Sequence, residues 1–272
     1  MQTADALSRM SGLSRLEARM LLVRVLGRPT EWLLAHGDEP VAPELSEAFL
    51  SLAARRRQGE PMAYLVGERE FMGHTFVVSP CVLIPRPETE LLVEAAIQAI
   101  IDSRSPAILD LGTGSGAVAI SLALARPDAR VSATDISPDA IAVAQGNARR
   151  LGARVQWWQG SWYGALPIES RFDLIVSNPP YVRSGDPHLA QGDLRFEPAM
   201  ALTDGDDGLS ALRQIVSGAA AHLASGGSVW LEHGFDQANA VRSLLVTAGY
   251  NHVVTMVDLA GHDRITGGTL SL

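Results

Sequence analysis

Hydrophobic residues follow two different periodicities along the chain, and the change comes near residue 60. Before it, apolar positions recur at helical spacing. Ser14-Arg15-Leu16-Glu17 is a capping box, which predicts a helix that carries Met20 and Val23 with Leu16 on one side and ends at Gly27. This part of the chain therefore begins as a helical region.

Two more helices are expected before residue 60. Thr30 can cap a short helix that Gly37 ends, and Pro43 can open a longer one that Gly59 closes. Together the helices predict a small bundle over residues 1–60, which carries no catalytic set of side chains.

A short segment with strand-like alternation follows. Tyr64-Leu65-Val66 and Phe71 predict one strand, and Phe76-Val77-Val78, after a turn at Gly73, predicts a second. Three prolines then stiffen the connection to the next helix. We expect residues 61–87 to form a β-hairpin and linker that packs on a second domain, residues 88–272.

From Ile108 onward, strand and helix patterns alternate. The expected strands are Ala107–Asp110, Arg130–Asp135, Val155–Gln159, Phe172–Ser177, Ser228–Leu231 and His252–Val257. The expected helices are Ala117–Ala125, Pro138–Leu151, Leu209–Leu223 and Gln237–Ala248. This alternation predicts an α/β domain with a mostly parallel sheet covered on both faces.

Composition and charge exclude some classes of reaction and of binding partner. The chain has 272 residues with 47% hydrophobic and 19% charged residues, as expected for about two globular domains. Acids outnumber bases 30 to 22, every base is Arg, and the net charge is −8. The absence of Lys excludes lysine-based catalysis, and the negative charge argues against binding nucleic acid without regard to sequence.

The cysteine, histidine and hydropathy patterns bear on disulfides, metal sites and the location of the protein. Cys81 is the single cysteine, so an internal disulfide is excluded, and the seven His show no metal-ligand spacing, so no metal is expected. The N-terminus lacks the pattern of a signal peptide, and no apolar stretch reaches about 18 residues. We therefore expect a cytoplasmic protein without a membrane segment.

The first strand of the α/β region runs directly into Asp110-Leu111-Gly112-Thr113-Gly114-Ser115-Gly116, and a helix follows at once. Glycines allow a tight turn and close approach of a ligand, although a turn without a ligand is the simpler alternative. Asp135 ends the second strand, where a carboxylate can accept hydrogen bonds from ribose hydroxyls, and Ser137 already supplies the next helix cap. Trp162 follows the third strand, where its indole can pack on an adenine face.

The fourth strand delivers Asn178-Pro179-Pro180-Tyr181 to the carboxyl edge of the sheet, where ligands bind. A planar NH₂ group conjugated to a carbonyl or ring is a poor nucleophile. The Asn178 side-chain oxygen and the Pro179 carbonyl can hold its two N–H bonds and orient it, and Tyr181 can lie against its plane. A simple strand terminator would explain the prolines but not Asn178 or Tyr181.

The glycine loop G-T-G-S-G resembles that of class I S-adenosylmethionine-dependent methyltransferases rather than the G-x-G-x-x-G of dinucleotide enzymes. The resemblance covers residues 107–272 and implies a Rossmann-like domain with a seven-stranded sheet. It implies S-adenosylmethionine as cofactor, bound by Gly112, Thr113, Gly114, Ser115, Gly116, Asp135, Trp162 and Asn178.

The N-P-P-Y motif resembles that of methyltransferases that modify planar amino groups, either the exocyclic nitrogen of adenine or the side-chain amide of glutamine. By this resemblance Asn178, Pro179 and Tyr181 are catalytic, and the substrate is bound by Asn178, Pro179, Pro180 and Tyr181. The motif alone does not separate the two substrates.

Further segments resemble the protein-(glutamine-N5) methyltransferases that act on peptide chain release factors, and the match then spans nearly the whole chain. They are Glu68–Phe71, Leu83–Glu90, Arg195–Pro198, Gly205–Leu209 and Asp258–Arg264. Pro87 stands where the related ribosomal-protein enzymes typically carry Ser, which favours the release-factor branch. Ser161 departs from the family, because many relatives carry an acidic residue there.

The resemblance implies methyl transfer to the glutamine N5 of the Gly-Gly-Gln motif in release factors, with the helical domain recognising the protein substrate. The alternatives are a ribosomal-protein glutamine methyltransferase, an adenine-N6 nucleic-acid methyltransferase and a non-enzymatic binding module. No direct nucleic-acid substrate and no membrane partner are expected.

The segment after Tyr181 is long and acidic. Between residues 182 and 208 six acids stand against two arginines. A loop of this length is uncommon unless it is functional or disordered, and its charge can repel a nucleic-acid backbone and attract a basic protein surface. An ordinary solvated loop is the alternative. The cations of Arg55-Arg56-Arg57 are expected to complement the dipole at the end of a helix rather than to bind RNA, and Glu232-His233 is not expected to act as a catalytic pair, because the chemistry requires no strong base.

Overall fold

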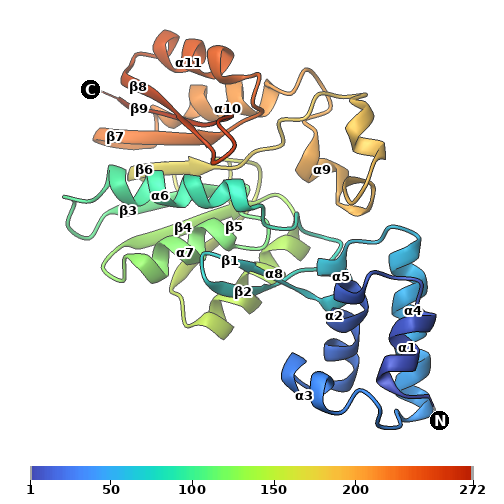
Figure 1. Cartoon of the computed structure of the whole chain (residues 1–272). Coiled ribbons are helices and arrows are strands. Elements are labelled where there is room, and N and C mark those ends of the chain that lie inside the picture. The colour runs from blue at the N-terminus through green and yellow to red at the C-terminus, as the bar shows by residue number, and fades with distance from the viewer. Residues whose placement is uncertain (1, 271–272) are drawn as a thin grey trace. The chain divides into compact units, whose positions relative to one another are not determined.

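The computed structural model describes residues 2–270, and the chain divides into two compact units (Figure 1). The smaller unit contains the chain up to Glu68 together with Ala190–Phe196. The larger unit contains Arg69–Leu189 and the chain from Glu197 onward. Residues 1, 271 and 272, at the outer ends of the two expected domains, lie outside the described residues.

The smaller unit is helical. Its helices are α1 (Ala4–Met10), α2 (Arg15–Leu26), α3 (Thr30–Ala35), α4 (Pro43–Arg57) and α5 (Met62–Val66). Leu7, Leu21 and Phe49 are fully buried in its core. Within residues 2–270, no helix combines the length and the apolar character needed to cross a membrane.

The predicted capping box is confirmed: Ser14 accepts from the Glu17 N–H, and the Glu17 carboxylate accepts from the Ser14 N–H. Two details were wrong. Leu16 and Met20 are exposed, because α2 buries Leu21 and its neighbours instead. Thr30 does not cap α3, since Pro29 takes the cap position and makes no side-chain hydrogen bond there.

The hairpin begins later than predicted. Residues 64–66 belong to α5, because Pro61 fixes the first turn and Gly67 ends the helix in the left-handed conformation. The strands of the hairpin are β1 (Glu68–Phe71) and β2 (His74–Val77). Phe71 and Phe76 meet edge to face in the core of the larger unit.

The larger unit contains a seven-stranded, mostly parallel sheet, which confirms the predicted α/β fold. Its strands are β3 (Ala107–Leu111), β4 (Arg130–Asp135), β5 (Val155–Gln159), β6 (Phe172–Ser177), β7 (Leu223–Glu232), β8 (Tyr250–Val257) and β9 (Asp263–Leu270). Their order is β5-β4-β3-β6-β7-β9-β8, and β9 runs antiparallel to both of its neighbours.

Helices cover both faces of the sheet, as the alternation predicted (Figure 1). One core contains α6 (Glu90–Ala99), α7 (Ala117–Ala125) and part of α8 (Pro138–Leu151), and the other contains α10 (Ser210–Ala219) and α11 (Ala238–Thr247). Strand residues alternate between the cores: Ile108 faces the first and Leu109 the second. The remaining short helices are 3-10 turns at Pro87–Thr89, Pro187–Ala190 and Leu194–Phe196, and α9 (Ala199–Leu202).

Strand β9 and helix α1 did not appear among the predicted elements. Strand β9 contains Gly267 and Gly268, which weaken a strand pattern. The structure shows why glycine is required: a Cβ on Gly267 would overlap the ring of Trp230 on β7. The side chain that makes this strand possible thus lies 37 positions earlier in the sequence.

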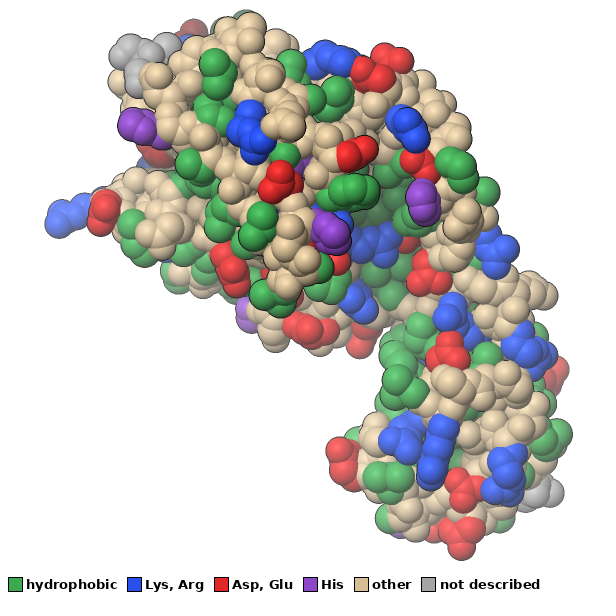
Figure 2. All heavy atoms as spheres, turned by 45° about the horizontal axis from the view of Figure 1, so that its top comes forward, with side chains coloured by type: hydrophobic (Ala, Val, Ile, Leu, Met, Phe, Trp, Pro, Cys, Tyr) green, Lys and Arg blue, Asp and Glu red, His purple; other side chains and the backbone are tan. Residues whose placement is uncertain are grey.

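On the face shown in Figure 2, acidic and arginine side chains are interspersed rather than separated into one acidic and one basic region. Each of the three arginines at the end of α4 has a local partner: Arg55 pairs with Glu60, Arg56 with Glu17, and Arg57 donates to the Ser11 carbonyl. They help to hold the helical unit together.

Candidate active site

A cavity of about 360 Å³ opens at the carboxyl ends of the parallel strands in the larger unit. Leu111 at the end of β3 pairs with Ser177 at the end of β6, and the Ser177 hydroxyl donates to the Leu111 carbonyl over 2.7 Å. The glycine loop and the N-P-P-Y segment therefore start side by side. Among the predicted site residues, the cavity wall includes Gly112, Thr113, Gly114, Ser115, Asp135, Trp162, Asn178 and Pro180.

The glycine loop reaches the cavity with its first four residues but not its last. Gly112 and Gly114 have positive φ, and no other atom lies within 4 Å of the position a Cβ on Gly114 would occupy. Gly116 is off the wall, where it precedes α7. A Cβ there would come within 2.8 Å of Ile120 and 3.0 Å of Ala144. Gly116 therefore permits helix packing and Gly112 leaves room for the Trp162 ring, whereas Gly114 leaves space for a ligand.

Asp135 is half-buried on the cavity wall, at the end of β4. Its carboxylate accepts from the Gly114 N–H over 2.8 Å and from the Ser137 N–H over 2.9 Å. Burial raises its pKa, and these two donors oppose the rise. Ser137 caps α8 as expected, and Asp135 in addition fixes the glycine loop through the Gly114 N–H.

Asp110 is a wall residue that was not predicted to belong to the site. It is 1% exposed, and its Oδ2 accepts from the Thr113 hydroxyl over 2.6 Å and from the Ala119 N–H over 3.2 Å. Burial raises its pKa to about 7. Asp110 thus ties the loop to the first turn of α7 and places a second carboxyl group beside Asp135.

Trp162 lies against the glycine loop. It has a positive φ of 45°, rare for a bulky residue, and its ring carbons approach the position of a Cβ on Gly112 to 3.2 Å. The indole therefore covers the loop where only glycine leaves room. Trp162 lines the cavity, and its role as a flat surface for an adenine ring stays a prediction.

The N-P-P-Y segment divides between the cavity and the interior. Asn178 and Pro180 line the cavity, whereas Pro179 is buried and Tyr181 turns inward. The Asn178 Nδ2 donates to the Thr89 hydroxyl over 3.1 Å. Within residues 2–270, the Asn178 Oδ1 accepts no hydrogen bond, so the acceptor end of this amide is available to a ligand.

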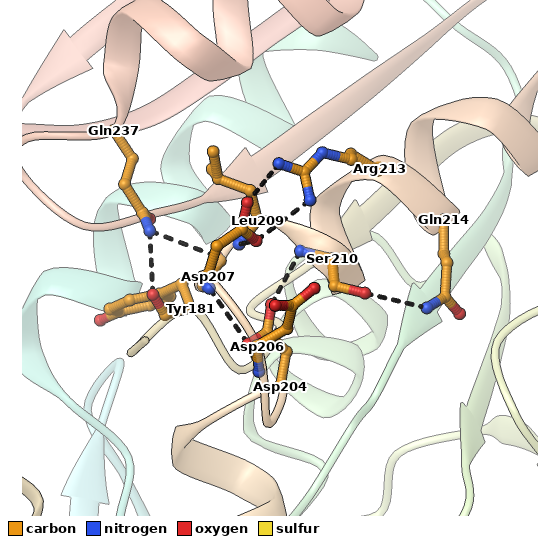
Figure 3. Close-up of polar contacts among 10 residues, drawn as sticks. Tyr181, Asp204, Asp206, Asp207, Leu209, Ser210, Arg213, Gln214 and Gln237 are labelled. Atoms are coloured by element: carbon orange, nitrogen blue, oxygen red, sulfur yellow. Dashed lines mark hydrogen bonds and ion pairs between the residues drawn. The ribbon is translucent and has the colours of Figure 1, made fainter. Parts of the chain in front are cut away.

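Tyr181 is held at both its hydroxyl and its backbone. The hydroxyl donates to the Glu232 Oε1 over 3.2 Å, and the carbonyl accepts from the Gln237 Nε2 over 2.9 Å (Figure 3). Gln237 also donates to the Gly208 carbonyl. Burial and the adjacent Glu232 charge raise the pKa of the Tyr181 hydroxyl, so it stays protonated and acts as a donor.

Most carboxylates of the acidic segment, residues 182–208, have hydrogen-bond or ion-pair partners among the described residues. Asp204 accepts from the backbone N–H groups of Asp206, Gly208 and Ser210, and Asp207 pairs with Arg213 (Figure 3). Asp186, Asp193 and Glu197 also pair with arginines. Most of these carboxylates therefore cap turns or pair with cations and hold the shape of the segment, while its proposed attraction for a basic protein surface stays a prediction.

Glu197 joins two of the sequence motifs. Its side chain is fully buried, pairs with Arg86, and accepts from the Ile84 N–H over 3.1 Å. Pro85 on one side and Pro198 on the other are part of the cavity wall. Two segments about 110 residues apart are thus fixed to each other at the cavity.

Comparison with known proteins agrees with this geometry. A family model described as "PrmC N-terminal domain" matches residues 2–67, and one described as "Methyltransferase small domain" matches residues 87–200. Two solved structures share the fold. A methyltransferase from Pyrococcus furiosus matches with a TM-score of 0.54 and 18% identity, over 80% of this chain and 98% of that one. A 16S rRNA N2 G1207 methyltransferase from T. thermophilus matches with a TM-score of 0.56 and 24% identity, over 75% of this chain and 49% of that one.

Curated relatives match over nearly the full length. Release factor glutamine methyltransferases from Bordetella pertussis and Burkholderia pseudomallei are 60% and 53% identical, over 95% and 98% of this chain and 96% of each relative. The Escherichia coli protein of the same name is 44% identical over 93% of this chain and 91% of its own length. With both the helical and the catalytic unit matched at this identity, the chain belongs to the release factor glutamine methyltransferase family.

Proposed function

We propose that this protein transfers a methyl group from S-adenosylmethionine to the side-chain amide nitrogen of the glutamine in the Gly-Gly-Gln motif of peptide chain release factors. The proposal rests on the hydrogen bonding of the two ends of the Asn178 side-chain amide. Its Nδ2 is occupied by Thr89, while Oδ1 has no partner among the described residues and lies on the wall of the glycine-loop cavity.

The residues around the cavity fit S-adenosylmethionine. Asp135 keeps acceptor lone pairs for ribose hydroxyls beyond its two backbone contacts, and Trp162 offers a flat apolar face. Gly114 leaves open space where any other residue would place a Cβ. When bound, this cofactor supplies an electrophilic methyl group on a positively charged sulfur, and no metal is needed.

The chain itself contributes orientation rather than strong acid or base chemistry. An amide nitrogen is a poor nucleophile because its lone pair is delocalised into the carbonyl. The Asn178 Oδ1 accepts one N–H of the substrate amide, and the Pro179 carbonyl is the proposed acceptor of the other. This pair orients the nitrogen and favours the positive charge that develops on it. Pro180 and Tyr181 complete the proposed substrate site.

A protein substrate agrees better with the surface than a nucleic acid does. The net charge is −8, and on the face shown in Figure 2 acidic side chains stand among the arginines, so that face does not offer the continuous basic surface that a phosphate backbone favours. We propose the helical domain, predicted as residues 1–60 and extended by α5 to Val66, as the recognition domain, and residues 88–272 as the methyltransferase domain, with the hairpin and linker joining them in the chain. The separate family match of the helical region over residues 2–67 supports this division.

A labelling experiment tests the function. The protein is incubated with methyl-labelled S-adenosylmethionine and either a release factor or its variant with Gln→Ala in the Gly-Gly-Gln motif. We expect label in the first protein and none in the second. Label in a ribosomal protein, or in DNA or RNA, would favour one of the alternatives, and cofactor binding without transfer to any of them would indicate a binding module.

A further inference from the structure

Gln237 uses both ends of its side-chain amide. Its Oε1 accepts from the Gly234 N–H over 2.8 Å, and its Nε2 donates to the carbonyls of Tyr181 and Gly208 over 2.9 and 3.2 Å (Figure 3). The residue is half-buried at the cap position before α11, where its own backbone N–H donates to the Gly234 carbonyl. A reversed amide would turn its oxygen toward two carbonyl oxygens, so the contacts fix one orientation.

The contact to Tyr181 falls where the N-P-P-Y segment has little backbone support. The parallel pairing of β6 ends at Ser177, and Pro179 and Pro180 have no N–H with which to bond to a neighbour. The Tyr181 carbonyl is the point at which Gln237 ties this segment to the start of α11. The path of the two prolines beyond the strand therefore depends on how that carbonyl is held.

The second acceptor of Gln237 belongs to the turn of residues 204–208. Asp204 is part of the cavity wall, and its carboxylate accepts from the N–H groups of Gly208 and Ser210 over 3.1 and 2.7 Å. A Cβ on Gly208 would lie 2.4 Å from the Tyr181 carbonyl oxygen and 2.9 Å from the Gln237 Nε2. The turn thus packs directly against both groups, and Gln237 joins two segments that contribute to the same cavity.

We propose that Gln237 is a positioning residue: by holding the Tyr181 carbonyl against the 204–208 turn, it keeps the Pro179 carbonyl in the orientation that accepts from the reacting glutamine amide. The inference rests on the proposed function and deepens it. Gln237 lies off the cavity wall, so it acts through the backbone that it holds. A displacement of about 1 Å at a group that orients a substrate can lower a rate roughly 100-fold.

Removal of the amide is the first test. Gln237→Ala should lower kcat roughly 10- to 100-fold, because the displaced acceptor no longer orients the glutamine amide. Affinity for S-adenosylhomocysteine, measured by calorimetry, should stay within about threefold, since Asp135 and the glycine loop are held by contacts of their own. Gln98→Ala, at an exposed position on α6, is the matched control and should change neither quantity.

Gln237→Glu gives a second test with a defined pH dependence. Its carboxylate can still accept from Gly234, but its other oxygen would face the carbonyls of Tyr181 and Gly208 without a hydrogen. Protonation supplies an O–H that donates to one of them. The ratio of its kcat to that of the unchanged protein should therefore rise several-fold as the pH is lowered from 8 to 5. The same ratio should stay flat in Gln237→Ala and in Gln98→Glu.

The charged groups around this position favour protonation of the introduced carboxyl group. They are Asp236 in the same turn, Asp204, Asp206, Asp207 and Arg213 in the neighbouring turn and α10, and Arg183 and Glu232 near Tyr181 (Figure 3). Both arginines already pair with acids, Arg213 with Asp207 and Arg183 with Asp186. Acidic neighbours raise the pKa of a carboxyl group and bring its titration toward the range of the assay.

A spectroscopic readout does not need turnover. The four tyrosines are followed by Leu, Gly, Val and Asn, so Tyr181-Val182 is the single Tyr-Val pair in the sequence. Protein labelled with ¹³C at the tyrosine carbonyls and ¹⁵N in valine therefore gives one carbonyl–amide NMR correlation. We expect its carbonyl signal to move upfield, as on loss of a hydrogen bond, in Gln237→Ala and in Gln237→Glu at pH 8. In Gln237→Glu at pH 5 it should return toward its original position.

Gly208→Ala displaces the same carbonyl without changing Gln237. Its Cβ would overlap the Tyr181 carbonyl oxygen, and we expect kcat to fall at least roughly tenfold. Gly205→Ala is the matched control in the same turn, since Gly205 also has positive φ but no atom lies within 4 Å of its missing Cβ. This pair keeps the proposal testable if a Gln237 variant fails to fold.

Three results would overturn the proposal. The first is a normal kcat in Gln237→Ala. The second is a kcat ratio of Gln237→Glu that does not change with pH. The third is a Tyr181 carbonyl signal that stays in place in Gln237→Ala. Absence of label with the unchanged protein, combined with the expected carbonyl shifts, would instead contradict only the proposed function.

Discussion

The side chain of Asn178 has two chemically different ends, and only one of them can serve the proposed reaction. Thr89 occupies the donor end and leaves the acceptor end on the cavity wall. An alanine at this position would remove the acceptor and leave Thr89 without its donor. The cavity itself would keep its shape, since the surrounding backbone is fixed by strand pairing at Ser177.

We therefore predict that Asn178→Ala lowers turnover by about 10²- to 10³-fold, as the loss of a transition-state hydrogen bond does in other enzymes. Binding of the cofactor, measured by calorimetry, should remain within a few-fold. Asn239→Ala, an exposed position on α11, is the matched control and should change neither quantity. Near-normal turnover in Asn178→Ala would exclude the assigned role.

Asp135 acts at the other end of the cavity. Its substitution by alanine removes the proposed ribose acceptor and also the acceptor for the Gly114 and Ser137 N–H groups. We predict that Asp135→Ala weakens cofactor binding at least roughly tenfold, equivalent to about 1.4 kcal/mol. Calorimetry measures the dissociation constant, with exposed Asp139→Ala as the control. An unchanged constant would contradict the ribose assignment.

Side chains whose positions depend on local sequence were predictable, and those that depend on distant contacts were not. Asp135 ends β4 and Gly112 directly follows β3, so the end of each strand places them at the sheet edge. The bond from Thr89 to Asn178 joins residues 89 positions apart. Glu232 has a similarly distant partner in Tyr181, and nothing in the sequence near either residue indicates the pair.

At the scale of elements, the cavity wall depends on segments that have little regular structure of their own. Residues 83–86 and 197–203 form no strand with each other, so Glu197 is the connection that replaces a ladder of backbone hydrogen bonds. Because Glu197 is buried and Arg86 is only partly exposed, the pair is shielded from solvent. Removing the carboxylate would leave the Arg86 charge and the Ile84 N–H without their partner.

Glu197→Gln should lower the free energy of unfolding of the protein by about 1–3 kcal/mol, because the amide keeps one acceptor but loses the ion pair. Urea unfolding measures this change. Glu169→Gln, at an exposed position, should leave the midpoint unchanged. Equal midpoints for the two variants would show that the buried pair contributes nothing to stability.

Elements with a strong period of their own were predicted correctly, and the errors lie where tertiary contacts override local preference. The parallel strands and the helices between them follow their hydrophobic pattern. The segment at Tyr64 has β-forming residues, yet it is helical because Pro61 and Gly67 set its ends and Leu65 packs in the helical core. Strand β9 was missed because its glycines make room for Trp230, a contact that the local pattern does not show.

At the scale of the whole molecule, two buried carboxyl groups make stability depend on pH. Burial raises the pKa of Asp110 from 3.8 and that of Glu232 from 4.5, each to about 7. The folded state therefore retains these protons up to about pH 7, whereas the unfolded chain releases them near pH 4. Their contribution to stability is greatest near pH 4, falls as pH rises toward 7, and is constant above that.

Asp110→Asn removes one of the two groups without removing the acceptor for Thr113. We predict that the free energy of unfolding of this variant declines less between pH 5 and pH 8 than that of the unchanged protein. Urea titrations at pH 5, 6, 7 and 8 measure the slope. Asp102→Asn, which changes an exposed carboxylate, should retain the original slope. A slope unaffected by Asp110→Asn would show that this carboxyl group is not titrating in that range.

The chain enters the helical unit twice, once at its start and again through Ala190–Phe196. Arg195 fixes this second segment by donating to the Gln58 carbonyl, and Asp193 pairs with Arg56. Gly59 makes the contact possible: its φ is +94°, and a Cβ there would overlap the Arg195 guanidinium. The segment continues directly into Glu197 and the cavity wall, so its attachment constrains the long loop after Tyr181.

Gly59→Ala should therefore displace Arg195 and release the segment. The measurement is the rate of limited proteolysis within residues 183–196, which we predict to rise several-fold, because local opening controls cleavage of folded chains. Gly152→Ala is the matched control, since Gly152 also has positive φ but no atom lies within 4 Å of its missing Cβ. Both variants place a Cβ at a positive φ, so faster cleavage only in Gly59→Ala identifies the Arg195 contact as the cause. Equal cleavage rates in the two variants would show that backbone strain alone accounts for any release of the segment.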